Sequence, residues 1–288
     1  MKPIFEGTCT ALVTPFEEQR INFTMFRQLL ERQISKGINA VVVCGTTGES
    51  ATLTDEEKLD LYAAAVDCVR GRIPVIAGTG SNCTKHSIYL SKIAEKLGVD
   101  GLLLVSPYYN KTTDTGLVEH YRAIADSVSL PCILYNVPSR TGMDISVNVC
   151  KELAQHPNIH GIKEASGNIS KVVQLRSQCP KDFYIWSGND DQTVPIMSMG
   201  GKGVISVLSN LYPEEMTALS QLCLNNRYEA ASRLQAQLWP YMDAMFCEVN
   251  PIPIKAAMKL EGYDCGSCRL PLVELSEKNQ TKLEALLY

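Results

Sequence analysis

Short apolar runs alternate along the chain with longer stretches in which apolar positions recur at helical spacing. Such runs, bounded by glycine, proline or asparagine, predict buried strands, and the stretches between them predict amphipathic helices. One helix has a clear start, because Thr54 occupies an N-cap position and Glu57 follows three residues later. The predicted strands lie at residues 8–13, 39–44, 73–77, 100–105, 131–135, 159–163, 183–187 and 203–207.

The order of these elements predicts an α/β fold with a parallel sheet, because parallel strands need a crossover helix between them. An open doubly wound sheet and a closed barrel both fit eight such units. The closed (β/α)8 TIM barrel is favoured, because polar segments with glycine follow nearly every strand and no G-x-G-x-x-G turn follows the first. We therefore expect a barrel over residues 1–224 and a helical extension packed on it over residues 225–288.

The extension is predicted from three stretches with helical spacing, residues 229–246, 250–262 and 271–287. Prolines and glycines interrupt them, as expected where helices start and stop. No linker or low-complexity segment separates them from the barrel, so we expect the extension to pack on it and to serve oligomer contacts.

Composition is typical of a globular protein without a nucleic-acid or membrane partner. Hydrophobic residues make up 45% and charged residues 20% of the 288 residues, which argues against disorder. The net charge is −4, Lys and Arg are scattered, and no apolar run approaches the roughly 20 residues of a membrane helix. The eleven cysteines lie mostly in apolar runs, and Cys265 and Cys268 form one C-x-x-C without a second pair. Free thiols in a reducing cytoplasm explain them better than disulfides or zinc.

Candidate chemistry lies in the segments after the strands, because TIM barrels carry their catalytic groups there. These segments hold a lysine, an arginine, tyrosines and hydroxyls but no histidine, since the four histidines are expected on helices or at a strand start. Metal-assisted catalysis and a Ser–His–acid arrangement both call for histidines at this end of the barrel. We therefore expect no metal site.

Lys163, at the end of the sixth predicted strand, is the candidate nucleophile. Desolvation in a partly apolar pocket lowers the pKa of a lysine and frees the neutral amine to attack a ketone. The alternative is a lysine at the rim that reaches water or pairs with Glu164. Because successive side chains of a strand point to opposite faces, Lys163 and Glu164 are expected on different sides of the sheet, with Glu164 structural.

The segment GTTGES is a candidate anion site, because Thr46 and Thr47 bring hydroxyls and consecutive backbone N–H groups to a strand-to-helix turn. A glycine turn with an N-cap explains the same residues equally well. Tyr109 and Tyr135 are candidates for a proton relay with Thr46, although a single tyrosine is more often a packing residue. Arg140 is a candidate for a second carboxylate, or else a surface or interface arginine.

Five segments, GTTGES, SPYYN, YNVPSRTG, GIKEASGN and NPIPIKAAM, resemble in this order the dihydrodipicolinate synthase / N-acetylneuraminate lyase family of Schiff-base aldolases. The resemblance extends from about residue 5 to about residue 260. The arginine in YNVPSRTG is similar to the dihydrodipicolinate branch, because the sialic-acid branch lacks it. The resemblance implies a lyase that needs no cofactor. It would condense pyruvate with L-aspartate 4-semialdehyde to 4-hydroxy-tetrahydrodipicolinate, in lysine and diaminopimelate biosynthesis.

The same resemblance implies a role for each site residue. Lys163 would form an imine with pyruvate, and Thr46 and Thr47 would hold the pyruvate carboxylate. Tyr135 would handle protons above the imine, linked through Thr46 to Tyr109, which reaches across a dimer interface into a neighbour's site. The other implied residues are Arg140 for the carboxylate of the aldehyde, and Gly188 and the Ile205 backbone for the pocket wall. A homotetramer, built as a dimer of dimers, is implied as well.

Family members that lysine inhibits bind it at the dimer interface, and the corresponding positions here are Ser50, Ala51, Lys58, Asn82, His86 and Tyr108. Sensitive bacterial enzymes typically have histidine or glutamate at the position of Lys58 and glutamate at that of His86. A ligand ammonium would lose its carboxylate partner here and meet a positive charge. We therefore expect L-lysine to inhibit this protein weakly or not at all.

Three alternatives compete with this interpretation. Another pyruvate-dependent lyase of the same family, acting on a sugar acid, is disfavoured by Arg140. A non-catalytic sensing barrel would be expected to lack the lysine or a tyrosine, yet every motif position is filled. A phosphate-binding barrel would need a glycine-rich loop after the last two strands, and SGNDD and SVLSN are poor versions of one.

Overall fold

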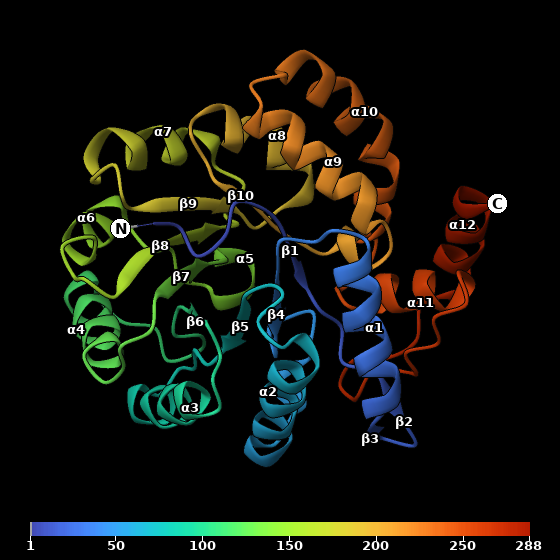
Figure 1. The fold of residues 1–288 in the computed structure, drawn as a ribbon, viewed down its shortest axis with the longest axis horizontal. Helices are drawn as coiled ribbons and strands as arrows, with labels where there is room; N and C mark the ends of the chain where they lie inside the picture. The colour runs from blue at the N-terminus through green and yellow to red at the C-terminus, as the bar shows by residue number, and fades with distance from the viewer. Residues whose placement is uncertain (1) are drawn as a thin grey trace.

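The computed structural model describes residues 2–288 and shows a closed barrel of eight parallel strands with helices around it (Figure 1). The strands follow one another around the barrel in the order β1-β10-β9-β8-β7-β6-β5-β4. This architecture confirms the predicted (β/α)8 fold. The barrel strands are β1 (Gly7–Ala11), β4 (Ala40–Val43), β5 (Val75–Gly78), β6 (Gly101–Val105), β7 (Cys132–Asn136), β8 (Ile159–Glu164), β9 (Tyr184–Ser187) and β10 (Gly203–Ser206).

Helices cover the outside of the barrel, and the last ones extend beyond it (Figure 1). Three short 3-10 turns, η1 (Ser50–Thr52), η2 (Asp190–Gln192) and η3 (Leu208–Asn210), follow strands at the barrel mouth. The helices are α1 (Phe23–Ser35), α2 (Asp55–Val69), α3 (Thr84–Lys96), α4 (Asp114–Ala125), α5 (Pro138–Thr141), α6 (Val147–Leu153), α7 (Ile169–Gln178), α8 (Thr193–Ser198), α9 (Pro213–Leu224), α10 (Tyr228–Ala244), α11 (Ile252–Leu260) and α12 (Glu277–Leu287).

The barrel strands are almost entirely buried, because one face of the sheet packs inside the barrel and the other packs against helices. This explains why they read as continuous apolar runs rather than as alternating ones. Inside and outside form two separate hydrophobic cores. The buried residues of the inner core are Phe5, Cys9, Ala11, Ala40, Val42, Ile76, Leu103, Ile133, Tyr135, Val137, Tyr184, Trp186 and Ile205.

Two glycines allow neighbouring strands to approach at sites where a side chain would not fit. A Cβ on Gly203 would lie 1.8 Å from the carbonyl oxygen of Gly7, and a Cβ on Gly161 would lie 2.0 Å from that of Tyr184. The first contact joins β10 to β1 and the second joins β8 to β9. Closure of the barrel at these seams therefore requires glycine.

The predicted helix signals are present. Thr54 accepts a hydrogen bond from the Glu57 amide while the Glu57 carboxylate accepts one from the Thr54 amide, which completes a capping box at the start of α2. Gly37, Gly71 and Gly98 have positive φ angles just after α1, α2 and α3. These local signals fix the helix ends independently of the rest of the fold.

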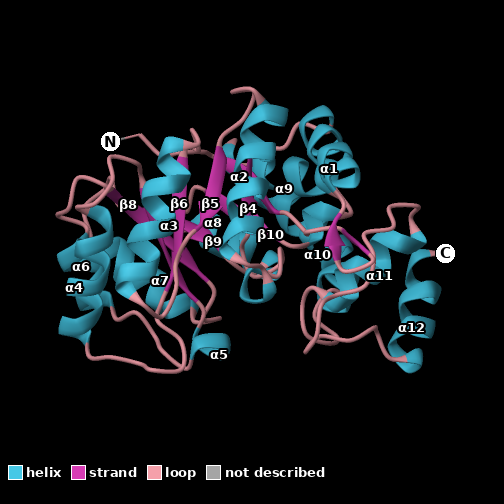
Figure 2. Ribbon diagram, turned by 90° about the horizontal axis from the view of Figure 1, so that it is seen from below, coloured by secondary structure: helices cyan, strands magenta, loops and turns pink. Residues whose placement is uncertain are grey.

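The C-terminal extension lies on one side of the barrel, where α10, α11 and α12 appear together in Figure 2. Its helices are shorter than expected at one end: α12 begins at Glu277, and residues 271–276 form no helix. Leu270, just before this segment, and Val273 within it are exposed apolar residues. Pro240 lies inside α10 without ending it. The boundary at residue 224 stays a prediction.

A hairpin between β1 and α1 was not predicted. Residues Phe16–Glu17 and Arg20–Ile21 form a two-stranded hairpin, β2 and β3, between β1 and α1. Its strands are too short to show a hydrophobic period.

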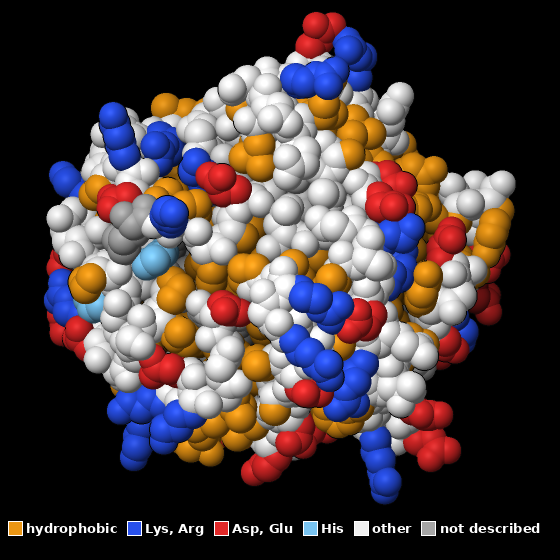
Figure 3. Space-filling model, in the orientation of Figure 1, with side chains coloured by type: hydrophobic (Ala, Val, Ile, Leu, Met, Phe, Trp, Pro, Cys, Tyr) orange, Lys and Arg blue, Asp and Glu red, His pale blue; other side chains and the backbone are white. Residues whose placement is uncertain are grey.

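On the face drawn in Figure 3, acidic and basic side chains are interspersed, with a group of basic side chains over α1 and α2.

Candidate active site

Lys163 lies inside the barrel near the end of β8. It is in register with Tyr135 of β7 and with Trp186 of β9, both of which belong to the inner core. Only 5% of Lys163 is exposed, and its Nζ lies 4.2 Å from the centroid of the Tyr135 ring. Within residues 2–288, no carboxylate lies within ion-pair distance of this ammonium. The lysine is therefore buried without a counter-ion and rests on an aromatic face.

Glu164 points to the other side of the sheet, as the alternation of the strand predicts. Its carboxylate accepts hydrogen bonds from Asn136 Nδ2 and from the Ser166 amide, and lies 3.6 Å from Lys171 Nζ. Glu164 is therefore occupied in the layer between the sheet and α7, and the alternative of a Lys163–Glu164 pair is wrong.

The positive charge of Lys163 lowers the pKa of two buried groups, the Asp190 carboxyl and the Cys9 thiol, against the effect of burial. Burial raises the pKa of the Asp190 carboxyl, and hydrogen bonds from Ser206 and from the amides of Leu208 and Val207, together with the charge of Lys163, oppose this. Burial also raises the pKa of the Cys9 thiol, and the charge of Lys163 opposes that shift. Sequence reasoning missed Asp190, although it lies in the segment SGNDD after β9.

Gly188 lies against the stem of Lys163, and Ile205 lies in the inner core two strands away. A Cβ on Gly188 would lie 2.6 Å from Ala165 Cβ and 3.1 Å from Lys163 Cε, so a side chain there would displace the lysine stem. Ile205 is fully buried in the inner core on β10. Gly188 directly follows β9, the neighbour of β8, and Ile205 lies on β10, the next strand around the barrel.

The GTTGES turn follows β4, which lies four strands from β8 in either direction around the barrel and so faces Lys163 across its mouth. Within the turn, the amides of Gly48 and Ser50 bond the Gly45 carbonyl, and the Glu49 amide bonds the Thr46 carbonyl. In the described part of the chain, the amides of Thr46 and Thr47 have no such acceptor. Two adjacent N–H donors are therefore available to an anion.

The extension reaches this turn from the far end of the sequence. Asn250 Nδ2 donates to Thr47 Oγ1 over 3.0 Å, and the Asn250 carbonyl accepts a hydrogen bond from Arg140 Nη2 over 3.2 Å. Asn250 is buried, and no described atom bonds its Oδ1. The structure thus joins two predicted site residues, Thr47 and Arg140, through a residue that sequence reasoning left without a role.

A buried ion pair holds the same turn from a second side. Glu49 has a left-handed backbone with φ of 56°, and its Oε1 lies 2.6 Å from Lys255 Nζ, with side-chain exposures of 0% and 3%. Its Oε2 accepts a hydrogen bond from the Arg269 amide. The Arg269 guanidinium in turn bonds the carbonyls of Thr52 and Gln19 and pairs with Glu57. The motif NPIPIK contained Lys255, but only the fold identifies its partner.

The predicted proton relay is not assembled within a single chain. Tyr135 is buried on β7 and Thr46 is half-buried in the turn after β4, whereas Tyr109 is 93% exposed with φ of 69°. No hydrogen bond joins the three hydroxyls within residues 2–288 of one chain. An exposed tyrosine in a left-handed conformation beside the barrel mouth is a residue presented outward.

Comparison with known proteins settles the family. Residues 4–288 match the dihydrodipicolinate synthetase family. The chain belongs to this family. A 4-hydroxy-tetrahydrodipicolinate synthase of Caldicellulosiruptor saccharolyticus is 51% identical over 286 residues, which cover 99% of this chain and 97% of that protein. Membership confirms the predicted family and the predicted enzyme class, a lyase.

Solved structures of the family agree with the barrel. Dihydrodipicolinate synthase of Cyanidioschyzon merolae with lysine bound has a TM-score of 0.96 at 38% identity, covering 99% of this chain and 98% of that one. The enzyme of Acinetobacter baumannii complexed with pyruvate has a TM-score of 0.96 at 39% identity, covering 98% and 97%.

The positions predicted to correspond to a lysine-binding site lie beside the barrel mouth. Ser50 and Ala51 belong to η1, Asn82 and Tyr108 to the loops after β5 and β6, and Lys58 and His86 to α2 and α3. The structure adds a carboxylate that sequence reasoning overlooked. Asp55 lies 2.9 Å from His86 Nε2 and 3.7 Å from Lys58 Nζ. A ligand ammonium at these positions would therefore find a carboxylate, but one that is already paired.

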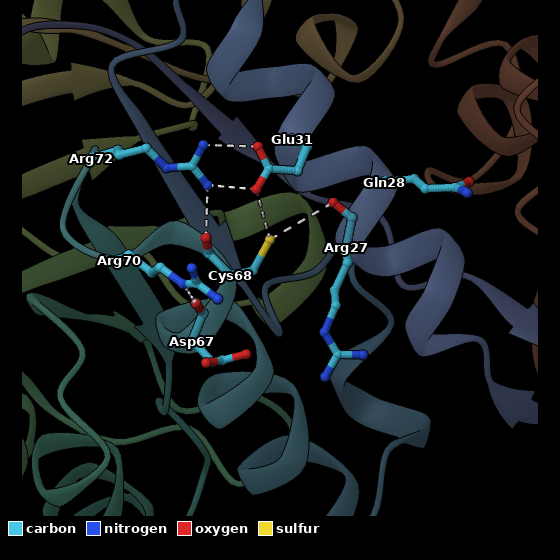
Figure 4. Close-up of a pocket in the computed structure, with 7 residues that line it drawn as sticks. All are labelled: Arg27, Gln28, Glu31, Asp67, Cys68, Arg70 and Arg72. Atoms are coloured by element: carbon cyan, nitrogen blue, oxygen red, sulfur yellow. Dashed lines mark hydrogen bonds and ion pairs between the residues drawn. The ribbon is translucent and has the colours of Figure 1, made fainter.

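A cleft of about 750 Å³ lies elsewhere, between α1 and α2 (Figure 4). Arg72 and Glu31 face each other there through two hydrogen bonds, and burial together with Glu31 raises the pKa of the Cys68 thiol. Glu31 and Arg72 are thus paired with each other, and the thiol is not activated. The lining residues, none of which belongs to the predicted site, are Arg27, Gln28, Glu31, Asp67, Cys68, Arg70 and Arg72.

Other predicted features are also located. His86 and His120 lie on α3 and α4 and His160 at the start of β8, whereas His156 lies in the turn after α6 rather than on a helix. Over residues 2–288, no three His, Cys, Asp or Glu side chains are grouped to hold a metal ion, and all eleven cysteines are unpaired. None of the helices in this range is long and apolar enough to cross a membrane.

Proposed function

We propose that this protein condenses pyruvate with L-aspartate 4-semialdehyde to 4-hydroxy-tetrahydrodipicolinate through a Schiff base on Lys163, in lysine and diaminopimelate biosynthesis. The observation that carries the proposal is a buried lysine without a carboxylate partner, opposite a turn with two free amides. The name of the Caldicellulosiruptor saccharolyticus relative and the pyruvate complex of the Acinetobacter baumannii enzyme support the same chemistry. The free thiols suit a cytoplasmic location.

The first steps follow from the chemistry of an amine and a ketone. The neutral amine of Lys163 attacks the keto carbon of pyruvate, and loss of water gives a protonated imine. The imine withdraws electrons, so a methyl proton of pyruvate leaves and an enamine forms. Thr46 and Thr47 hold the pyruvate carboxylate through their amides and hydroxyls, and Tyr135, whose ring lies against the lysine, moves the protons.

The second half of the reaction releases the lysine. The enamine carbon attacks the aldehyde carbon and forms the new carbon–carbon bond. The amino group of the bound aldehyde substrate then attacks the imine carbon, the Lys163 amine leaves, and the ring closes. Arg140, at the end of α5 on the rim, binds the carboxylate of the aldehyde during both steps.

The exposure of Tyr109 supports an oligomeric enzyme. A tyrosine that is 93% exposed in one chain is well placed to enter the site of a neighbouring subunit and complete the relay with Tyr135 and Thr46 there. We propose a homotetramer, built as a dimer of dimers. One family structure is described as a monomeric variant, so the oligomeric state has to be measured, for example by sedimentation, before and after Tyr109→Phe.

Borohydride trapping tests the proposal directly. Reduction in the presence of pyruvate should convert the imine to a stable secondary amine and add mass to the peptide that contains Lys163. Without pyruvate no mass should be added. Mass on another lysine, or none, overturns the assignment. A panel of aldehydes with pyruvate separates this activity from that of a family lyase acting on a sugar acid.

We also propose that L-lysine inhibits this enzyme weakly or not at all. The reason given by the structure differs from the one read from the sequence, because Asp55 is present but is paired with His86 and Lys58. A ligand ammonium would have to displace one of them and then lie beside both. The Cyanidioschyzon merolae enzyme, by contrast, is a relative whose structure has lysine bound. An inhibition constant below the millimolar range would contradict the proposal.

A further inference from the structure

We propose that Asn250 is a positioning residue that orients the Thr47 hydroxyl toward the pyruvate carboxylate and ties it to Arg140. The proposal rests on the proposed function and deepens it. Asn250 lies in the turn between α10 and α11, yet it contacts the loop after β4 and the helix after β7. It is the residue through which the extension touches both expected carboxylate-binding groups.

The direction of one hydrogen bond sets the role of the Thr47 hydroxyl. An amide Nδ2 can only donate, so Thr47 Oγ1 accepts from Asn250 and must direct its own proton elsewhere. Within residues 2–288 that proton has no acceptor. Thr47 is 2% exposed, so the hydroxyl proton and the neighbouring free amides form a donor group that a small carboxylate can satisfy.

The backbone of the same residue restrains the second group. The Asn250 carbonyl accepts a hydrogen bond from Arg140 Nη2, on a side chain that is otherwise exposed. A long arginine loses considerable side-chain freedom when it is held in place, and a prior hydrogen bond lowers that cost on binding. The side chain of Asn250 thus orients the group that binds pyruvate, and its backbone restrains the group that binds the aldehyde.

Substitution of the side chain separates these two effects. In Asn250→Asp, both terminal atoms accept hydrogen bonds, so Thr47 would turn its proton toward residue 250 and a negative charge would lie near the pyruvate carboxylate. The apparent dissociation constant of pyruvate should rise about 10- to 100-fold. In Asn250→Ala it should rise less, because the hydroxyl becomes free rather than misdirected. The constant for the aldehyde should change less than that for pyruvate in both variants.

Pyruvate alone provides the readout. Exchange of its methyl protons with deuterated water, followed by NMR at increasing pyruvate concentration, reports imine and enamine formation without the aldehyde. A double-mutant cycle with Thr47→Val shows whether Asn250 acts through that hydroxyl: the effect of Asn250→Ala should largely vanish in the Thr47→Val background. Asn225→Asp makes the same charge change at an exposed residue of the extension and should leave the exchange unaltered.

Each outcome has a definite meaning. Pyruvate constants within twofold of the parent in both Asn250 variants, or additive effects in the cycle, overturn the role of Asn250. A folded parent that traps no pyruvate on Lys163 overturns the proposed function instead. If Asn250→Asp does not fold, Asn250→Ala and the cycle still decide, with thermal melting as the check on folding.

Discussion

Lys163 and Lys255 are two buried lysines near the mouth of one barrel, and only Lys255 has a carboxylate partner within residues 2–288. The Nζ of Lys163 lies 4.2 Å from the ring centroid of Tyr135, and the Nζ of Lys255 lies 4.4 Å from that of Phe16. Lys255 also has Glu49 at 2.6 Å, whereas Lys163 has no carboxylate partner within residues 2–288. An aromatic face thus accompanies both amines, and only the carboxylate distinguishes them.

The difference separates a lysine with a structural role from one that can react. A lysine that bonds a buried carboxylate keeps its proton, neutralises its partner and holds two segments together. A buried lysine without such a partner can give up its proton and act as a nucleophile. Burial alone therefore does not distinguish Lys163 as the candidate nucleophile, but burial without a carboxylate partner does. Four variants test this comparison.

Lys163→Met should have the largest effect on activity. Without the amine no imine forms, and we expect a loss of kcat on the order of 10³-fold or more. Stability should change little, because no carboxylate within residues 2–288 lies at ion-pair distance from this lysine and methionine has a similar shape. Steady-state rates and thermal melting measure the two effects, and Lys181→Met at an exposed position is the control. A large loss of stability in Lys163→Met would contradict the comparison.

Lys255→Met should have the largest effect on stability. It leaves the Glu49 carboxylate buried and unpaired, which costs about 3–5 kcal/mol of unfolding free energy. Because Glu49 belongs to the GTTGES turn, activity should fall too, through weaker pyruvate binding. Urea unfolding at a fixed protein concentration measures the loss. The double variant Glu49→Gln with Lys255→Met removes both charges and should recover most of it, and a failure to recover would count against the ion pair as the cause.

Lys171→Met should be intermediate. Lys171 pairs with Asp144 at 2.5 Å and lies 3.6 Å from Glu164. The Asp144 side chain is 54% exposed, so water can solvate its carboxylate when the lysine is removed. Glu164 keeps its hydrogen bonds from Asn136 and the Ser166 amide. We expect a loss of about 1–3 kcal/mol in urea unfolding. A loss as large as that of Lys255→Met would show that hydrogen bonds do not compensate for the missing cation.

Glu31→Gln should have the smallest effect. The pair between Glu31 and Arg72 is geometrically good, but its side chains are 53% and 41% exposed, so water already solvates both charges. The Arg72 hydrogen bond lowers the pKa of Glu31, so the pair contributes at neutral pH and loses its contribution as the pH falls through that lowered pKa. Melting temperatures of parent and variant should differ slightly at pH 7 in low salt and converge in acid. A difference that persists in acid would exclude the charge as its origin.

Much of the barrel could be predicted because its signals are local. Each predicted strand is a contiguous apolar run, and the capping box at Thr54 needs only four residues. The orientation of Lys163 followed from the alternation of side chains along β8 once its neighbours were taken as a strand. The hairpin β2–β3 and the late start of α12 could not be predicted, because two-residue strands have no period and the apolar residues Leu270 and Val273 remain exposed.

The contacts that complete the site join residues that are far apart in the sequence. Thr47 and Asn250 are separated by 203 residues, and Arg269 is separated from Glu49 by 220. The Lys58–Asp55 contact is local to α2, but His86 of α3 reaches Asp55 only because α2 and α3 pack side by side. No spacing rule connects such residues, since the chain returns to them from a different part of the fold.

The sequence by itself determined the eight strands, the side of the sheet on which Lys163 lies, and the set of groups near the barrel mouth. These depend on the direction of side chains, which repeats every two residues in a strand and every 3.6 residues in a helix and can therefore be read from neighbouring positions. Only the tertiary structure decided which buried lysine has a carboxylate partner and which has none. It also decided that the extension, through Asn250 and Lys255, holds the turn opposite Lys163, the proposed nucleophile. Those outcomes depend on distances between remote segments, and such distances exist only after the barrel has closed.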